Sequence, residues 1–205
     1  MTLADNLAII VLAAGQSSRL GQMKQLLPIN NKSLVATQLE KALVVSNNVY
    51  CVLGCQAEQL QRCIDHLPIT TIINSDWESG MASSIAAGVK ELNTDINAVM
   101  IVLVDQWQIA STDFTKLKTN WLNNPDAIIV SQNNSDQLKA SVGPPVIFPA
   151  RYFSELCQLT GQQGAKPLLK KYKGYLLPVT NTHAFADIDT PEQLLAMNKV
   201  INNQK

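Results

Sequence analysis

The chain of 205 residues lacks an excess of charge of either sign, and this excludes several classes of partner. Lys and Arg together number 16, as do Asp and Glu, so the formal net charge is zero. Nucleic acids and anionic membrane surfaces bind basic proteins, so we expect neither as a partner. The sequence also has no apolar run near the ~20 residues of a membrane span. Because residues 1–5 show no basic segment of a secretion signal, we expect a cytoplasmic protein.

The sequence also has few residues of the types that form disulfides or zinc sites. Its two histidines, His66 and His183, are isolated, and we assign neither a role. The four cysteines show neither C-x-x-C nor zinc-ligand spacing: Cys51, Cys55, Cys63 and Cys157. A cytoplasmic setting favours free thiols, so we expect them to be core or helix-face residues.

Repeats and low-complexity tracts are absent as well, and strand and helix patterns alternate instead. Apolar runs predict strands at 7–12, 49–53, 69–73, 98–104, 127–130, 142–148 and 175–179. Helical periodicity appears at 34–43, 57–64, 83–92, 112–121, 153–159, 166–172 and from 191 onward, with Ser33, Ser111 and Thr190 as N-caps. Such alternation predicts one α/β domain over 1–205, with a mainly parallel sheet and helices on both faces.

One predicted strand, at 142–148, contains Gly143, Pro144 and Pro145. A proline has no N–H group to donate to a neighbouring strand. We therefore expect this segment to be an edge strand, or to begin as a strand only after a loop.

The first predicted strand leads into a loop that suits a polyphosphate. Small residues end the strand at Ala13, Ala14 and Gly15, where a ligand could come close to the backbone, and Gly15 can also adopt a positive φ. The loop then supplies backbone N–H groups and two cations, Arg19 and Lys24. The alternative is an ordinary loop with solvated cations. The stretch is neither a Walker A loop nor a G-x-G-x-x-G fingerprint.

Acidic residues stand at two other places where a ligand would bind. Asp105 ends the most hydrophobic run, and ligands of open α/β sheets bind at the carboxyl ends of strands, so Asp105 could hold Mg²⁺. It could also be a turn or cap residue. Asp187 and Asp189 stand at i, i+2, which points both side chains the same way in an extended segment. They also precede a helix, where Asp is favourable for structural reasons alone.

Several of these stretches together resemble the molybdenum cofactor nucleotidyltransferase family. The segment LAAGQSSRLGQMKQLLP, at 12–28, is similar to its signature loop, and is closer to the cytidylyltransferase branch than to the guanylyltransferase branch. Further similarity lies in WESGMASSIAAG at 77–88, GQQGAKPLL at 161–169 and DIDTPEQL at 187–194. Two positions depart from the family pattern: Trp107 stands where proline is usual, and Pro144 where many relatives have His. Lys166 remains available for an anion.

The resemblance implies a three-layer, Rossmann-like nucleotidyltransferase fold, with a nucleotide-binding half at about 1–110 and an acceptor-binding half at about 111–205. It implies Lys24, Arg19 and Asp105 as catalytic residues and Mg²⁺ as the cofactor, held by Asp105 and Asp189. It also implies a set of nucleotide-binding residues: Ala13, Ala14, Gly15, Arg19, Lys24, Gly80 and Ser84.

By the same resemblance, the reaction is the transfer of CMP from CTP to molybdopterin, with pyrophosphate released and a molybdoenzyme or its chaperone as a further partner. Ala14 favours CTP, because its methyl group would crowd a purine more than a pyrimidine. Alternatively, Ala14 only packs on the sheet. Two other functions stay open: guanylyl or sugar-phosphate nucleotidyl transfer, and a non-catalytic module that binds a cofactor.

Overall fold

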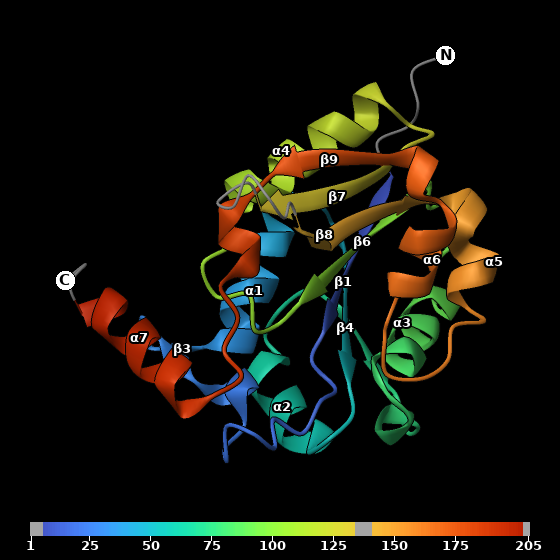
Figure 1. Cartoon of the computed structure of the whole chain (residues 1–205). Helices are drawn as coiled ribbons and strands as arrows, with labels where there is room; N and C mark the ends of the chain where they lie inside the picture. Colours follow the sequence, from blue (N-terminus) through green and yellow to red (C-terminus); the bar gives the residue numbers. More distant parts are fainter. Residues whose placement is uncertain (1–5, 134–140, 203–205) are drawn as a thin grey trace.

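The computed structural model describes residues 6–133 and 141–202, and it is built on a central seven-stranded sheet (Figure 1). The strand order is β5-β4-β1-β6-β8-β7-β9. The bounds are β1 Leu7–Leu12, β4 Asn48–Leu53, β5 Thr70–Ile73, β6 Ala98–Leu103, β7 Ile128–Asn133, β8 Ser141–Pro149 and β9 Leu176–Thr180. Only β8 runs antiparallel to its neighbours. The predicted mainly parallel α/β sheet is therefore confirmed.

Strand β1 lies inside the sheet because every one of its six residues is apolar and buried. It pairs in parallel with β4 on one side and with β6 on the other. Leu12 is paired with Leu103, so the segments that follow β1 and β6 leave the sheet side by side, at the carboxyl ends of these strands. This register brings the loop after Leu12 close to Asp105.

Helices cover both faces of the sheet, as the alternating pattern predicts. Figure 1 shows α1, α2 and α4 on one face and α3, α5 and α6 on the other, with α7 lying to one side. The helix bounds are α1 Leu34–Leu43, α2 Ala57–Ile64, α3 Met81–Lys90, α4 Ser111–Asn123, α5 Phe153–Leu156, α6 Lys166–Lys171 and α7 Pro191–Asn202. Each face buries its own apolar cluster against the sheet, so the core has two layers.

Short elements complete the fold. A two-stranded antiparallel sheet joins β2 Pro28–Ile29 to β3 Lys32–Ser33. The 3₁₀ turns are η1 Lys24–Leu26, η2 Trp77–Ser79, η3 Ala150–Tyr152, η4 Lys173–Tyr175 and η5 Thr182–Phe185.

Two of the three predicted N-caps are confirmed. The Ser33 hydroxyl accepts from the backbone N–H of Ala36, and the Thr190 hydroxyl accepts from that of Gln193. The prediction for Ser111 is wrong, because Ser111 is already helical. There, Asp113 accepts from the N–H of Ala110 and thereby holds the first turn.

The prediction of an edge position for the proline-containing strand is wrong. Strand β8 lies between β6 and β7. The sheet accommodates the two prolines because the β7–β8 register shifts between Val130 and Ser131: Val130 pairs with Val146, and Ser131 with Gly143. Pro144 and Pro145 thus fall in an irregularity, where no N–H donor is required.

The four cysteines are free thiols, as predicted. Burial raises the pKa of the Cys51 thiol to about 12, as expected for a core residue. Within 6–133 and 141–202, no helix is both long and apolar enough to cross a membrane. The expectation about residues 1–5 lies outside the described residues.

Candidate active site

The loop after β1 is held in shape by a buried glutamine that the sequence reasoning missed. The Gln25 side chain is fully buried, and its amide nitrogen donates to the carbonyl oxygens of Ala13 at 2.9 Å and Gly15 at 2.6 Å. Its amide oxygen accepts from the Ser17 hydroxyl at 3.3 Å. In the sequence, Gln25 is only a polar residue between Lys24 and two leucines, which is a weak sign of a structural role. Its hydrogen-bond partners are brought to it only by the folded loop.

The same loop leaves its backbone open toward solvent. Among the described residues, the backbone N–H groups of 15–19 have no acceptor. A Cβ added to Gly15 would meet no atom within 4 Å, which leaves room for a ligand. Gly15 does not have the positive φ that its type allows; Ser17 and Gly21 do, at 59° and 72°. A row of unpaired donors beside two cations suits a polyphosphate.

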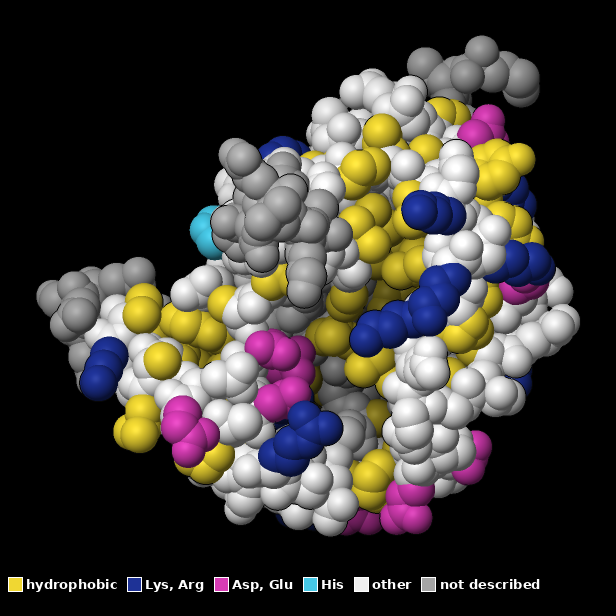
Figure 2. All heavy atoms as spheres, viewed as in Figure 1, with side chains coloured by type: hydrophobic (Ala, Val, Ile, Leu, Met, Phe, Trp, Pro, Cys, Tyr) yellow, Lys and Arg dark blue, Asp and Glu magenta, His cyan; other side chains and the backbone are white. Residues whose placement is uncertain are grey.

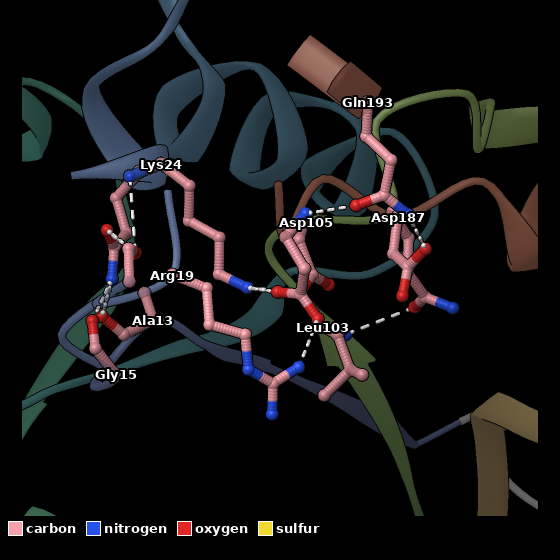
Figure 3. Close-up of polar contacts among 12 residues, drawn as sticks. Ala13, Gly15, Arg19, Lys24, Leu103, Asp105, Asp187 and Gln193 are labelled. Atoms are coloured by element: carbon pink, nitrogen blue, oxygen red, sulfur yellow. Dashed lines mark hydrogen bonds and ion pairs between the residues drawn. The ribbon is translucent and has the colours of Figure 1, made fainter. Parts of the chain in front are cut away.

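Lys24 joins the two acidic segments that the sequence predicts as metal ligands. Its Nζ atom lies 2.5 Å from Oδ2 of Asp105 (Figure 3). The same atom lies 2.8 Å from Oδ1 of Asp189. The side chains of Lys24 and Asp105 are only 14% and 12% exposed, so these charges interact where water screens them weakly. Lys24 is 81 positions from Asp105 and 165 positions from Asp189 in the sequence, and the fold brings the three residues together.

The charge states of this cluster depend on burial and on one another. Burial alone would lower the pKa of Lys24, but the carboxylates of Asp105 and Asp189 outweigh it and raise the pKa, which keeps the ammonium charged. Burial raises the pKa of Asp105, and Lys24 opposes that rise. The nearby charges of Asp189 and Asp187 raise it further. Asp105 therefore ionises more readily with the Lys24 ammonium beside it than without it.

The other two charged residues lie farther from this contact. Arg19 is 80% exposed, and its guanidinium lies 3.9 Å from Asp189. Asp187 lines a different cavity from Asp189, and its Oδ1 accepts from the Gln193 side chain at 3.2 Å. The two carboxylates thus line different cavities, although the charges of both act on Asp105. Gln193, which the sequence reasoning missed, also accepts from the backbone N–H of Asp189 at 2.8 Å.

The donor set fits a magnesium ion that is completed by substrate. Oδ1 of Asp105 is buried and has no hydrogen-bond partner in the described chain. Residues 6–133 and 141–202 hold no group of three or more His, Cys, Asp or Glu side chains placed to bind a metal. Mg²⁺ is usually held by one or two carboxylates together with substrate phosphates, so a pair is sufficient.

Two cavities of similar size meet at Asp105. One, of about 330 Å³, extends from the loop after β1 and Lys24 to the start of α3; we call it the first cavity. The other, of about 340 Å³, lies between β6, β8 and α6; we call it the second cavity. Asp105, Leu103 and Met81 line both. Figure 2 shows this region as a hollow with apolar side chains inside and acidic and basic side chains at its margins.

Gly80 and Ser84, two of the expected nucleotide-binding residues, lie at the start of α3 and line the first cavity. Gly80 has a φ of 121°, and a Cβ there would stand 2.5 Å from the carbonyl oxygen of Gly161. The Ser84 hydroxyl is buried and accepts from the Asn74 side chain at 3.0 Å. Ala14 and Gly15 line the same cavity. The Ala13 carbonyl is instead bound to Gln25, so Ala13 contributes through the loop's shape.

The two departures from the family pattern have different surroundings. Pro144 lines the second cavity, and its carbonyl oxygen accepts from the amide of Gln106 at 2.7 Å. Trp107 packs against the apolar cluster on the opposite face of the sheet, where its carbonyl oxygen accepts from Lys41. Gln106 also donates to the carbonyl oxygen of Ala184, so it joins β6, β8 and η5 behind Asp105. Lys166 lines the second cavity as well.

Comparison with known families agrees with this arrangement. Residues 9–175 match the MobA-like NTP transferase domain family, so the match includes the loop after β1 and the end of β6. The chain belongs to this family. It is therefore a nucleotidyltransferase, with a nucleotide as one substrate.

Curated relatives of this MobA-like domain carry different names. Nicotine blue oxidoreductase of Paenarthrobacter nicotinovorans is 30% identical over 192 residues, covering 90% of this chain and 93% of the relative. Molybdenum cofactor cytidylyltransferase of Escherichia coli K12 is 26% identical over 187 residues, covering 91% and 92%.

Solved structures share the fold over almost the whole chain. A homologue of a Mycobacterium tuberculosis protein, from Mycobacterium sp. strain JC1, superposes with a TM-score of 0.85 at 21% identity, covering 99% of this chain and 100% of its own. A Mycobacterium tuberculosis H37Rv protein in complex with manganese has a TM-score of 0.77 at 21% identity, covering 95% and 98%. These similarities describe the fold of this MobA-like domain.

Proposed function

We propose that the enzyme transfers CMP from CTP to molybdopterin and releases pyrophosphate, forming a cytosine dinucleotide cofactor. The observation that carries this proposal is Lys24, held between Asp105 and Asp189 where the two cavities meet. A cation at that junction lies between a nucleotide in the first cavity and an acceptor in the second. The name of the Escherichia coli relative supports this choice of substrates. On this proposal the protein is cytoplasmic, and its product passes to a molybdoenzyme or its chaperone.

The loop after β1 would bind the triphosphate. Its backbone N–H groups at 15–19 would donate to phosphate oxygens, and Arg19, which is mostly exposed, can turn toward the β- and γ-phosphates. Gln25 holds two carbonyl oxygens of the loop away from the ligand. The loop therefore meets a polyanion with donors and cations rather than with acceptors.

Lys24 would act on the reacting phosphorus. An oxygen of the acceptor phosphate attacks the α-phosphorus of CTP, and the bond from that phosphorus to the bridging oxygen of the β-phosphate breaks. Pyrophosphate leaves with the bonding electron pair. Such transfer depends on positioning and on neutralising charge. The Lys24 side chain can turn from the carboxylates to the phosphate oxygens, where its charge stabilises the transition state.

Asp105 and Asp189 would hold Mg²⁺, which when bound neutralises phosphate charge and orients both substrates. The unpartnered Oδ1 of Asp105 supports this assignment. The structural relative in complex with manganese is a further reason to test both ions. Gln193 would keep the backbone of Asp189 in place.

The choice of CTP is supported by the closed surroundings of Ala14. Ala14 is 5% exposed and lines the first cavity together with Trp77. Gly54 packs closely against both residues: a Cβ added to it would stand 2.6 Å from Trp77 and 2.9 Å from the Ala14 methyl group. This part of the cavity wall is therefore tightly packed. A two-ring base therefore meets more resistance here than a one-ring base.

Competition between CTP and GTP tests this proposal. With molybdopterin, Mg²⁺ and both triphosphates at equal concentration, we expect mainly the cytosine dinucleotide. The Ala14→Gly variant should reduce the preference, because one methyl group is worth ~10–200-fold in discrimination. Equal use of both triphosphates, or preference for GTP, by the unaltered enzyme would contradict cytidylyl transfer. It would leave nucleotidyl transfer standing.

A further inference from the structure

The segment Gly161–Gly164, of sequence GQQG, forms a loop between the two cavities; we call it the dividing loop. The two glutamines of this loop line different cavities. Gln162 lines the first cavity, whereas Gln163 lines the second. The family resemblance places this whole segment on the acceptor side. The structure instead places its two glutamines in different cavities.

Backbone contacts fix the position of the dividing loop. The carbonyl oxygen of Gly161 accepts from the backbone N–H of Ala82 at 3.2 Å, in the first turn of α3. A Cβ on Gly80 would stand 2.5 Å from that same oxygen, so the close approach requires glycine. At the other end, a Cβ on Gly164 would stand 2.8 Å from the sulfur of Met81. The loop is thus bonded to α3 at Gly161 and closely packed against Met81 at Gly164.

Gln162 lines the first cavity together with residues of η2 and of the start of α3. Gly15, Ser18 and Lys24, which belong to the loop after β1, line the same cavity, and on the proposed function they would bind the triphosphate. The wall around Gln162 is made by Trp77, Glu78 and Gly80, which come from η2 and the start of α3. An aromatic ring and a glycine that allows close approach suit a base and its ribose.

The Gln162 amide has little else to bind. Its nitrogen lies 3.5 Å from the Glu78 carbonyl oxygen, which is the long limit of a hydrogen bond. The side chain is exposed in the cavity wall. An amide presents both donors and an acceptor, so it can match the mixed donors and acceptors of a base edge or of ribose hydroxyl groups.

We propose that the dividing loop binds both substrates through neighbouring residues: Gln162 contacts the nucleoside of the triphosphate, and Gln163 contacts the acceptor. This inference rests on the proposed function. Because both side chains belong to one loop anchored on α3, a nucleotide that orders Gln162 also sets the position of Gln163. The loop then aligns the acceptor phosphate with the α-phosphorus.

The two glutamines provide matched variants for a test. Gln162→Leu and Gln163→Leu make the same chemical change at adjacent positions of one loop. Titration calorimetry with Mg²⁺ and whichever of CTP or GTP the unaltered enzyme binds more tightly gives the nucleotide Kd without acceptor. Losing one hydrogen bond should raise this Kd about 3- to 10-fold for Gln162→Leu and leave it unchanged for Gln163→Leu. The KM for molybdopterin at saturating nucleotide should show the opposite pattern.

The outcomes separate this inference from the proposed function. Equal effects of both variants on both substrates would mean that the loop is only a scaffold, and would overturn the inference. A normal nucleotide Kd for Gln162→Leu would overturn it as well. In either case, dinucleotide formation by the unaltered enzyme would leave the proposed function intact. Failure of the unaltered enzyme to form any dinucleotide would contradict the proposed function, while the calorimetric comparison still tests Gln162.

Discussion

At the scale of single residues, the site depends on Lys24, whose ammonium group stays charged because two carboxylates contact it. Asp105 and Asp189 raise the pKa of Lys24 against the opposing effect of burial. The same carboxylates gain a counter-ion in return, which matters most for the buried Asp105. Lys24 therefore joins the two acidic segments of the site, and in the proposed mechanism it acts on the substrates once they bind.

We predict that Lys24→Ala lowers turnover by at least ~10²-fold, the scale of losing one donor that stabilises developing charge. The fold should remain, because Asp105 can take up a proton once its counter-ion is gone: burial already raises the pKa of this carboxyl; circular dichroism checks this. The control is Lys32→Ala, which removes an exposed lysine paired with Glu40. Surface pairs of this kind contribute little, so the control should keep its activity and stability. Near-normal turnover of Lys24→Ala would rule out its assigned role.

At the scale of elements, the sequence predicted most of the architecture, and the errors have local causes. Strand β1 and helix α2 were predicted at their observed bounds because a buried run and a strong i, i+4 pattern need no distant partner. Strand β8 was misplaced because its prolines are tolerated through a register shift in β7. That shift depends on a neighbouring strand, which the local pattern does not reveal.

The start of α7 determines the position of one predicted metal ligand. Gln193 accepts from the backbone N–H groups of Asp189 and Thr190, at 2.8 and 3.0 Å, and donates to Asp187. This one side chain thus joins the helix to the acidic segment that precedes it. Gln193 is a positioning residue in the proposed mechanism, because it acts through Asp189.

We predict that Gln193→Ala weakens metal binding by about 10- to 100-fold, as is typical when a group that orients a ligand is lost. The measurement is the Kd for Mn²⁺, followed by electron paramagnetic resonance in the presence of CTP. Raising the metal concentration should restore turnover, which separates positioning of the ion from direct catalysis. The control, Asn198→Ala, changes an exposed residue of the same helix. An unchanged Mn²⁺ Kd for Gln193→Ala would exclude this positioning role.

At the scale of the whole molecule, the sheet brings together residues that are far apart in the sequence. Lys24, Asp105 and Asp189 were all singled out from the sequence, and the structure places them in contact. The parallel pairing of β1 with β6 accounts for the first two, since both lie beyond the same sheet edge. Gln25 and Gln106 were not found, because a buried amide is recognised only by partners that the fold supplies. The same holds for the dividing loop, whose two glutamines look alike in sequence.

The most direct test of the account follows two labels through one reaction. The enzyme is incubated with molybdopterin, Mg²⁺ and CTP labelled at either the α- or the γ-phosphorus. We predict that the α-label appears in the cytosine dinucleotide and the γ-label in pyrophosphate. The Asp105→Asn variant, which keeps the shape but loses the charge that a hard cation prefers, should form neither at a comparable rate. Binding of CTP with no transfer of the α-label to molybdopterin would contradict the account.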